Sequence, residues 1–111
     1  MKYSMKLKND PFNKIKDLKK KIELRLNDEK RKLLNVGDII EFTNVENQNK
    51  MLVEVIGLDY YSSFDELYKN YDKELLGYDE KEVKNPKDME AYYSIEEQKK
   101  YGVVAIKIKK I

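Results

Sequence analysis

Three charged residues near the start of the chain have the types and spacing best suited to hold a ligand. Lys20, Glu23 and Arg25 place an ammonium, a carboxylate and a guanidinium along one short segment. Together they can grip a phosphate and a base edge, because arginine binds phosphate or guanine with two parallel hydrogen bonds and glutamate accepts from an exocyclic amine. The neighbouring Lys21 joins them as a candidate ligand-binding residue. The simpler interpretation is a cross-strand ion pair, worth about 0 to 1 kcal/mol if it is exposed.

The amino-acid composition limits the chemistry that these residues can support. The chain contains neither cysteine nor histidine, which excludes disulfides, thiolate metal sites and catalytic systems built on those side chains. The acidic residues of region 72–90 lack the fixed spacing of a calcium loop, so we expect no metal site and no cofactor. If the protein is an enzyme, Lys20 would activate water or act as a nucleophile, and Glu23 would act as an acid or base. The sequence leaves open whether any catalysis occurs.

The tyrosines offer a second kind of contact to a ligand. The chain has nine tyrosines and no tryptophan. Tyr92 and Tyr93 are neighbours in a predicted loop, where their rings are candidates to stack on an unpaired base. Most of the other tyrosines sit at helical spacing or beside glycine, which is more typical of the edge of a core.

The net charge of +2 hides an uneven distribution along the chain. Residues 1–36 have a net charge of +7, residues 37–93 of −8 and residues 94–111 of +3. If the first and last segments are neighbours in space, one basic face opposes one acidic face, which is the field that a polyanionic ligand requires. Ordinary solvated surface is the alternative, and the acidic region 62–93 is also suited to contact a protein partner.

The chain has the length of one small domain, which we place over residues 1–111. No stretch approaches the roughly 20 apolar residues needed to cross a bilayer, and the first ten residues lack the apolar run of a signal peptide. We therefore expect a cytoplasmic protein that does not interact with a membrane.

Local sequence patterns predict five strands. Residues 2–8 and 21–26 alternate with a period of two, and so does the last run, residues 103–111. Residues 38–45 and 51–60 are two β-rich runs joined by a short polar loop, a pattern that predicts a hairpin.

Helix signals lie between these strands. Asn9 or Asp10 is predicted to cap a helix whose first residue is Pro11. The apolar face of this helix would consist of Phe12, Ile15 and Leu18.

Two further helices are predicted by S-x-x-E capping boxes that begin at Ser63 and Ser94, the second helix ending at Gly102. Residues 72–93 are expected to form short helices and loops. Their predicted buried anchors are Leu75, Leu76, Tyr78, Met89 and Tyr92.

The order of these elements predicts an α+β fold: a small, mostly antiparallel β-barrel decorated by short helices. A doubly wound parallel sheet is disfavoured because only a short loop joins the third and fourth strands.

Several segments resemble the ASCH domain family. Leu18-Lys-Lys-Lys-Ile-Glu23-Leu-Arg25 is similar to the G-x-K-x-x-E-x-R motif of that family, and Val36-Gly37-Asp38 resembles the start of the strand that follows it. The blocks Tyr61 to Leu67, Tyr92-Tyr93-Ser94 and Tyr101-Gly102 are also similar to bacterial members.

The resemblance implies a PUA-like barrel with a cleft beside the motif and a role in binding RNA, a nucleotide or a modified nucleoside. Lys20, Glu23 and Arg25 then correspond to the lysine, acid and arginine of the motif. Leu18 departs from the pattern, because it stands where the family has glycine. Some relatives are similar to amidohydrolases that use a threonine where this chain has Glu23. This difference counts against the same reaction here. The alternative function is a nucleoside amidohydrolase or a ribonuclease built on Lys20 and Glu23.

One geometric difficulty concerns the direction of Lys20. In a regular strand Lys20 has the parity of Ile22 and would point toward the core. We expect either a bulge or a strand that begins after Lys20 to turn this side chain the other way.

Overall fold

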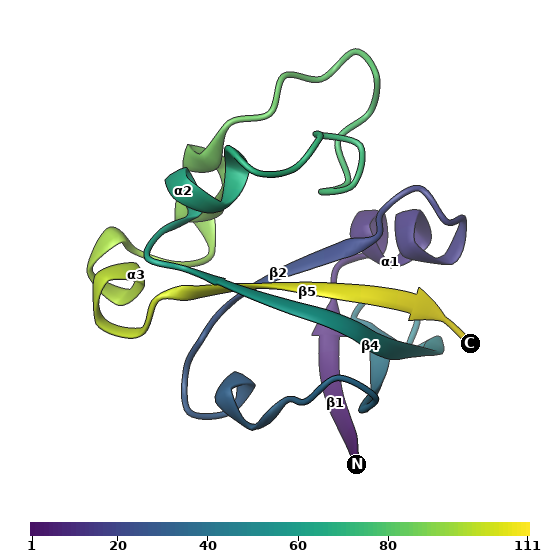
Figure 1. The fold of residues 1–111 in the computed structure, drawn as a ribbon. Helices are drawn as coiled ribbons and strands as arrows, with labels where there is room; N and C mark the ends of the chain where they lie inside the picture. Colours follow the sequence, from purple (N-terminus) through teal and green to yellow (C-terminus); the bar gives the residue numbers. More distant parts are fainter.

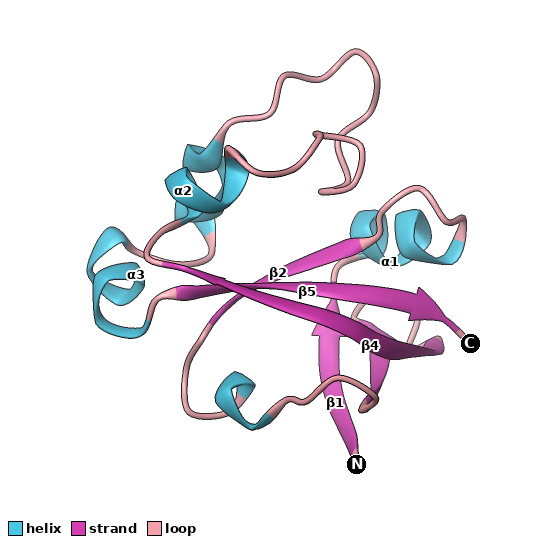
Figure 2. Ribbon diagram, in the orientation of Figure 1, coloured by secondary structure: helices cyan, strands magenta, loops and turns pink.

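The computed structural model describes all residues, 1–111, and is organised around five strands that form one curled sheet. Figures 1 and 2 show the sheet with short helices at its ends. The strands are β1 (Lys2–Leu7), β2 (Ile22–Leu26), β3 (Ile39–Asn44), β4 (Lys50–Tyr61) and β5 (Val103–Lys110). The helices are α1 (Asn9–Lys16), α2 (Phe64–Tyr68) and α3 (Ile95–Tyr101), with the 3-10 turns η1 (Arg31–Leu33) and η2 (Pro86–Ala91).

The strand order in the sheet is β1-β3-β4-β5-β2, and the sheet forms a half-barrel. The predicted hairpin is present as β3 and β4, and the pairs β4–β5 and β5–β2 are antiparallel as well. The pair β1–β3 is parallel, so the sheet is mixed. The predicted α+β fold with a mostly antiparallel, PUA-like barrel is therefore confirmed, with one parallel pair.

The barrel remains open between its two edge strands, β1 and β2. No ladder joins these strands. A side chain bridges the gap instead: Arg25 on β2 donates from Nη2 to the main-chain oxygen of Lys6 on β1, over 2.8 Å. The open seam therefore lies beside the segment that carries the charged motif.

Two apolar clusters lie on opposite faces of the sheet. The larger cluster fills the inside of the curl and includes Phe42, Val53 and Ile106, all fully buried. The second cluster lies between β2, β5 and the segment that contains α2, with Leu67 and Val103 at its centre. The alternation of β2 places Ile22, Leu24 and Leu26 in this second cluster. Residues of the other parity on β2 therefore face the seam.

Helix α1 covers one end of the barrel through the buried Phe12 and Ile15. The predicted cap by Asn9 or Asp10 is wrong, because the N-cap position is Lys8 and no side chain caps it. Asn9 already lies inside the helix, where its Oδ1 accepts from the amides of Asn13 and Asn44 at 3.0 and 2.9 Å. A long-range contact thus occupies the side chain that the local pattern assigned to capping.

Both predicted serine caps are confirmed. The Oγ of Ser63 accepts from the backbone of Glu66 at the start of α2, and Ser94 forms a complete capping box with Glu97 at the start of α3. Gly102 ends α3 with φ +72°, a conformation that favours glycine. No helix of the structure combines the length and apolar character needed to cross a membrane.

Leu18 is not on the apolar face of α1, contrary to the sequence prediction. The helix ends at Lys16, and Leu18 lies in the following turn with 62% of its surface exposed. Its φ of +63° is in the left-handed region. A glycine at this point of the motif therefore serves the turn, and this chain adopts the same turn with a strained leucine.

We expect Leu18→Gly to raise the free energy of unfolding by about 0.5–1 kcal/mol, because removal of the left-handed strain exceeds the added entropy of the unfolded chain. Urea unfolding measures this change. Lys19→Gly is the control, since Lys19 is exposed in the same turn without a positive φ, and it is expected to destabilise the protein. Equal losses of stability in both variants would contradict the assignment of strain to Leu18.

The segment between α2 and α3 is held mainly by side chains. Leu76 is its buried anchor, as predicted, and Leu75, Tyr78 and Met89 are partly buried against the second cluster. Tyr92 does not act as an anchor, because 54% of its surface is exposed. Lys84 of the segment donates to the main-chain oxygens of Tyr68 and Tyr71.

Candidate functional site

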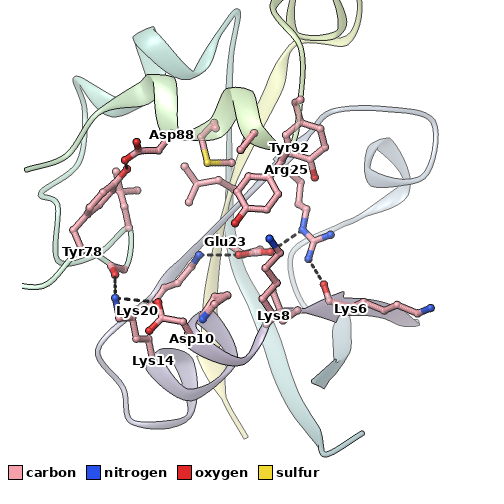
Figure 3. A pocket seen from close by; sticks show the side chains of 18 of the residues that line it. Lys6, Lys8, Asp10, Lys14, Lys20, Glu23, Arg25, Tyr78, Asp88 and Tyr92 are labelled. Carbon is pink, nitrogen blue, oxygen red and sulfur yellow. Dashed lines mark hydrogen bonds and ion pairs between the residues drawn. The ribbon is translucent and has the colours of Figure 1, made fainter. Parts of the chain in front are cut away.

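A cavity of about 540 Å³ opens at the seam of the barrel. Its walls come from β2, from the junction of β1 with α1, and from residues 76–93 of the segment that follows α2. Figure 3 shows the charged side chains of this cavity, with Lys20, Glu23 and Arg25 in a row across its middle. Most of the cavity lining thus comes from three parts of the chain that are distant in sequence.

Glu23 is the centre of a buried ionic row. Its Oε1 lies 3.0 Å from Nζ of Lys20, and its Oε2 lies 2.7 Å from Nε of Arg25. The side chains are only 10%, 5% and 12% exposed for Lys20, Glu23 and Arg25, respectively. The three groups therefore form a network of excess positive charge on the wall of the cavity.

The direction of Lys20 follows from where β2 begins. The strand starts at Ile22, and the backbone amides of Lys21 and Ile22 both donate to the oxygen of Leu75. Lys20 therefore precedes the regular alternation and turns to the same side as Glu23, as the second of the two expected solutions requires. Its aliphatic stem lies against Gly77, where an added Cβ would approach Cδ of Lys20 to 2.9 Å.

The charges of the row determine its protonation. Burial alone would raise the pKa of Glu23, but Lys20 and Arg25 outweigh it and hold the pKa below the ordinary value for glutamate. Burial likewise acts to lower the pKa of Arg25, and the Glu23 carboxylate more than compensates. Glu23 is consequently ionised at neutral pH.

The side of the cavity next to Arg25 is basic and aromatic. Lys6 and Lys8 are exposed there and take part in no ion pair with an acidic residue. The Nζ of Lys8 lies 4.9 Å from the centre of the Tyr92 ring, and 54% of the surface of Tyr92 is exposed. Tyr93 lies behind it, stacked on Phe64 and next to the guanidinium of Arg25.

The opposite side of the cavity is formed around Lys14 of α1. Its Nζ donates to the oxygen of Gly77 over 2.6 Å and pairs with Asp10 at 3.2 Å. Asp79 and Glu82 lie within 3.7 and 3.6 Å of the same ammonium. One lysine thus fastens the acidic segment to α1.

The sequence model of the ASCH domain matches residues 5–111, nearly the whole chain. The chain belongs to the ASCH domain family. The resemblance deduced from the motif segments is thereby confirmed.

Two solved structures are similar to this ASCH domain over its full length. Hypothetical protein PH0355 is 40% identical, with a TM-score of 0.85 and complete coverage of both chains. Protein PF0455 from Pyrococcus furiosus is 36% identical, with a TM-score of 0.72, and the match covers 100% of this chain and 98% of that one. A comparison with curated proteins finds no match. ASCH domains are associated in general with RNA binding.

The structure of this ASCH domain brings together five of the six candidate ligand-binding residues. These five line the cavity: Lys20, Glu23, Arg25, Tyr92 and Tyr93. Lys21 does not, because its side chain is exposed and lies outside the cavity wall. The turn that directs Lys20 toward Glu23 sends its neighbour the other way.

Sequence reasoning missed several residues of the cavity. Lys14 carried a local signal, since Asp10 precedes it at the i,i+4 spacing of a helical ion pair. For Lys6 and Lys8 the sequence gives no signal beyond their basic character, because they reach the cavity only where the folded sheet brings β1 close to β2.

Proposed function

We propose that this ASCH domain binds single-stranded RNA by holding one nucleotide in the cavity at the barrel seam. The observation that carries the proposal is the buried row of Lys20, Glu23 and Arg25, which faces an open cavity.

The burial of this row favours a ligand over a purely structural role. Removing ions from water is costly, and apolar residues of similar volume commonly stabilise a protein as well as or better than a buried ion pair. The row borders a cavity rather than filling the space between packed elements. Its charges are therefore placed where they can stabilise a bound polar ligand.

The groups around the cavity match the parts of a nucleotide. Lys20 and Arg25 are donors and Glu23 is an acceptor for the edge of a base. Tyr92 offers an exposed ring for stacking, with a strength of about 1–3 kcal/mol per base in other proteins. Lys6 and Lys8 provide ammonium groups for phosphate at the same side.

The test is the affinity of the Arg25→Met variant for a mixed-sequence pool of short RNA strands, measured by fluorescence anisotropy. We expect the dissociation constant to rise at least about tenfold, because a fork that binds a base edge or phosphate contributes roughly 1–3 kcal/mol. Arg31→Met is a matched control: the Arg31 side chain is 15% exposed and pairs with Asp28, but it does not line the cavity. Equal affinities for the two variants would contradict the proposal.

A hydrolytic role for Lys20 and Glu23 is the competing function, and their separation of 3.0 Å is the observation in its favour. The lowered pKa of Glu23 argues against it, since such a carboxylate is a weak base and is not protonated to act as an acid at neutral pH. Binding without turnover is the function that the geometry supports better.

A further inference from the structure

A row of polar side chains runs along the outer face of β1 and ends at the cavity. Strand alternation directs Tyr3, Met5 and Leu7 toward the barrel interior, where Met5 and Leu7 are buried. The residues of the other parity are Lys2, Ser4 and Lys6, and all three are exposed. Lys8 continues the row, because its φ of −68° and ψ of 163° keep the backbone extended up to the start of α1.

The spacing of this row suits a phosphate backbone. Side chains on one face of a strand recur every two residues, or about 6.5–7 Å. This repeat is comparable to the distance between successive phosphates in an extended single strand of RNA. Lysine ammoniums and a serine hydroxyl are the donors commonly found at phosphates.

The charge of the row is only partly neutralised within the protein. Lys6 and Lys8 have no acidic partner, as described above. Lys2 pairs with Glu41 of the neighbouring strand at 3.1 Å, and Lys50 approaches the same carboxylate at 3.6 Å. Glu41 thus neutralises at most one of the three lysines of the row, so the outer face of β1 attracts a polyanion.

The row is continuous with the cavity. Lys6 and Lys8 line its mouth, and Figure 3 shows Lys8 rising beside the row of Lys20, Glu23 and Arg25 while Lys6 extends outward from β1. In Figure 1, β1 runs from the N-terminus toward α1, so the row leads from the cavity to the far end of the barrel.

We propose that the outer face of β1 binds the sugar-phosphate backbone of the RNA that flanks the nucleotide in the cavity. Lys8 and Lys6 contact the phosphates nearest the cavity, and Ser4 and Lys2 contact the next ones. This inference rests on the proposed function, because the nucleotide held in the cavity fixes where the RNA begins on β1.

The experiment compares RNAs of two lengths against the full chain. A mixed-sequence pool of dinucleotides fills the cavity alone, and a pool of strands of about eight nucleotides, within the usual range of single-strand site sizes, also covers β1. For Lys2→Glu we expect unchanged affinity for the dinucleotides and about tenfold weaker binding of the longer strands at low salt. The salt dependence for the longer strands should become shallower by about 0.7 in log K against log salt, because the variant neutralises one phosphate fewer.

Lys109→Glu is the matched control. Lys109 is an exposed strand residue outside the cavity, its cross-strand neighbour on β4 is the acidic Glu54, and its replacement changes the net charge as much as that of Lys2. If Lys2→Glu and Lys109→Glu weaken binding of the longer RNAs equally, the proposal for the row on β1 is wrong and the attraction is a general effect of charge. If the wild-type protein binds the dinucleotides and the longer RNAs with equal affinity, the proposal for the row on β1 is also overturned, while the cavity proposal stands. Absence of binding to both pools overturns both.

Discussion

Replacement of Glu23 by alanine is expected to lower the free energy of unfolding by about 3–5 kcal/mol, the range found when one partner of a buried ion pair is removed. Glu23 alone balances Lys20 and Arg25, at 3.0 and 2.7 Å. Without it, one ammonium and one guanidinium charge remain largely buried with no counter-charge beside them. Urea unfolding followed by circular dichroism measures the loss.

A variant in which the whole row becomes apolar separates the structural from the functional role. In Lys20→Met/Glu23→Leu/Arg25→Met no unpaired charge is left, so we expect stability close to or above that of the wild type. The same variant should no longer bind RNA. A triple variant that unfolds as readily as Glu23→Ala would instead indicate that the ionic row, through the bond from Arg25 to Lys6, holds β2 beside β1.

Much of the fold could be predicted from local patterns because its strands are amphipathic. Alternation or β-rich composition marked every strand within one or two residues, and the serine caps marked the starts of α2 and α3. These signals depend on backbone geometry and on contacts within a few residues. The pairing of β1 with β3 depends on residues far apart in the sequence. No local pattern indicates whether the two strands run parallel or antiparallel.

The site was only partly visible in the sequence, for the same reason. The motif identified Lys20, Glu23 and Arg25, but alternation on β2 only separates Glu23 and Arg25 from the apolar residues and does not indicate that they are buried. The sheet curls until β1 approaches β2, and this curl encloses the face and buries Glu23. Burial of a charged residue thus depends on the curl of the whole sheet, which the pattern of one strand does not reveal.

Asn9 and Leu18 show how tertiary contacts and turns override local expectations. Asn9 has the residue type of a helix cap, yet its side chain binds Asn44 across the barrel end. Leu18 has the spacing of a buried helical residue, yet α1 stops before it and the chain must turn toward β2. In the first case a contact with the end of β3 decides the local structure, and in the second the turn that leads to β2 does so.

Gly77→Ala is expected to destabilise the protein by about 2–4 kcal/mol and to weaken RNA binding. The φ of Gly77 is +101°, which strains any residue with a side chain, and the new Cβ would lie 2.9 Å from Cδ of Lys20. A shift of the flexible Lys20 stem would relieve this contact and would displace its ammonium relative to Glu23. The same backbone also holds the oxygen that accepts from Lys14.

Gly37→Ala provides a closely matched comparison for this change. Its φ is +98°, but an added Cβ there meets no atom within 4 Å. We expect Gly37→Ala to cost about 1–2 kcal/mol from backbone strain alone and to leave RNA affinity unchanged. The extra loss of stability and the loss of affinity in Gly77→Ala would then measure the displacement of Lys20. If both alanine variants bind RNA like the wild type, the position of Lys20 does not matter for binding, and the role assigned to it in the cavity is wrong.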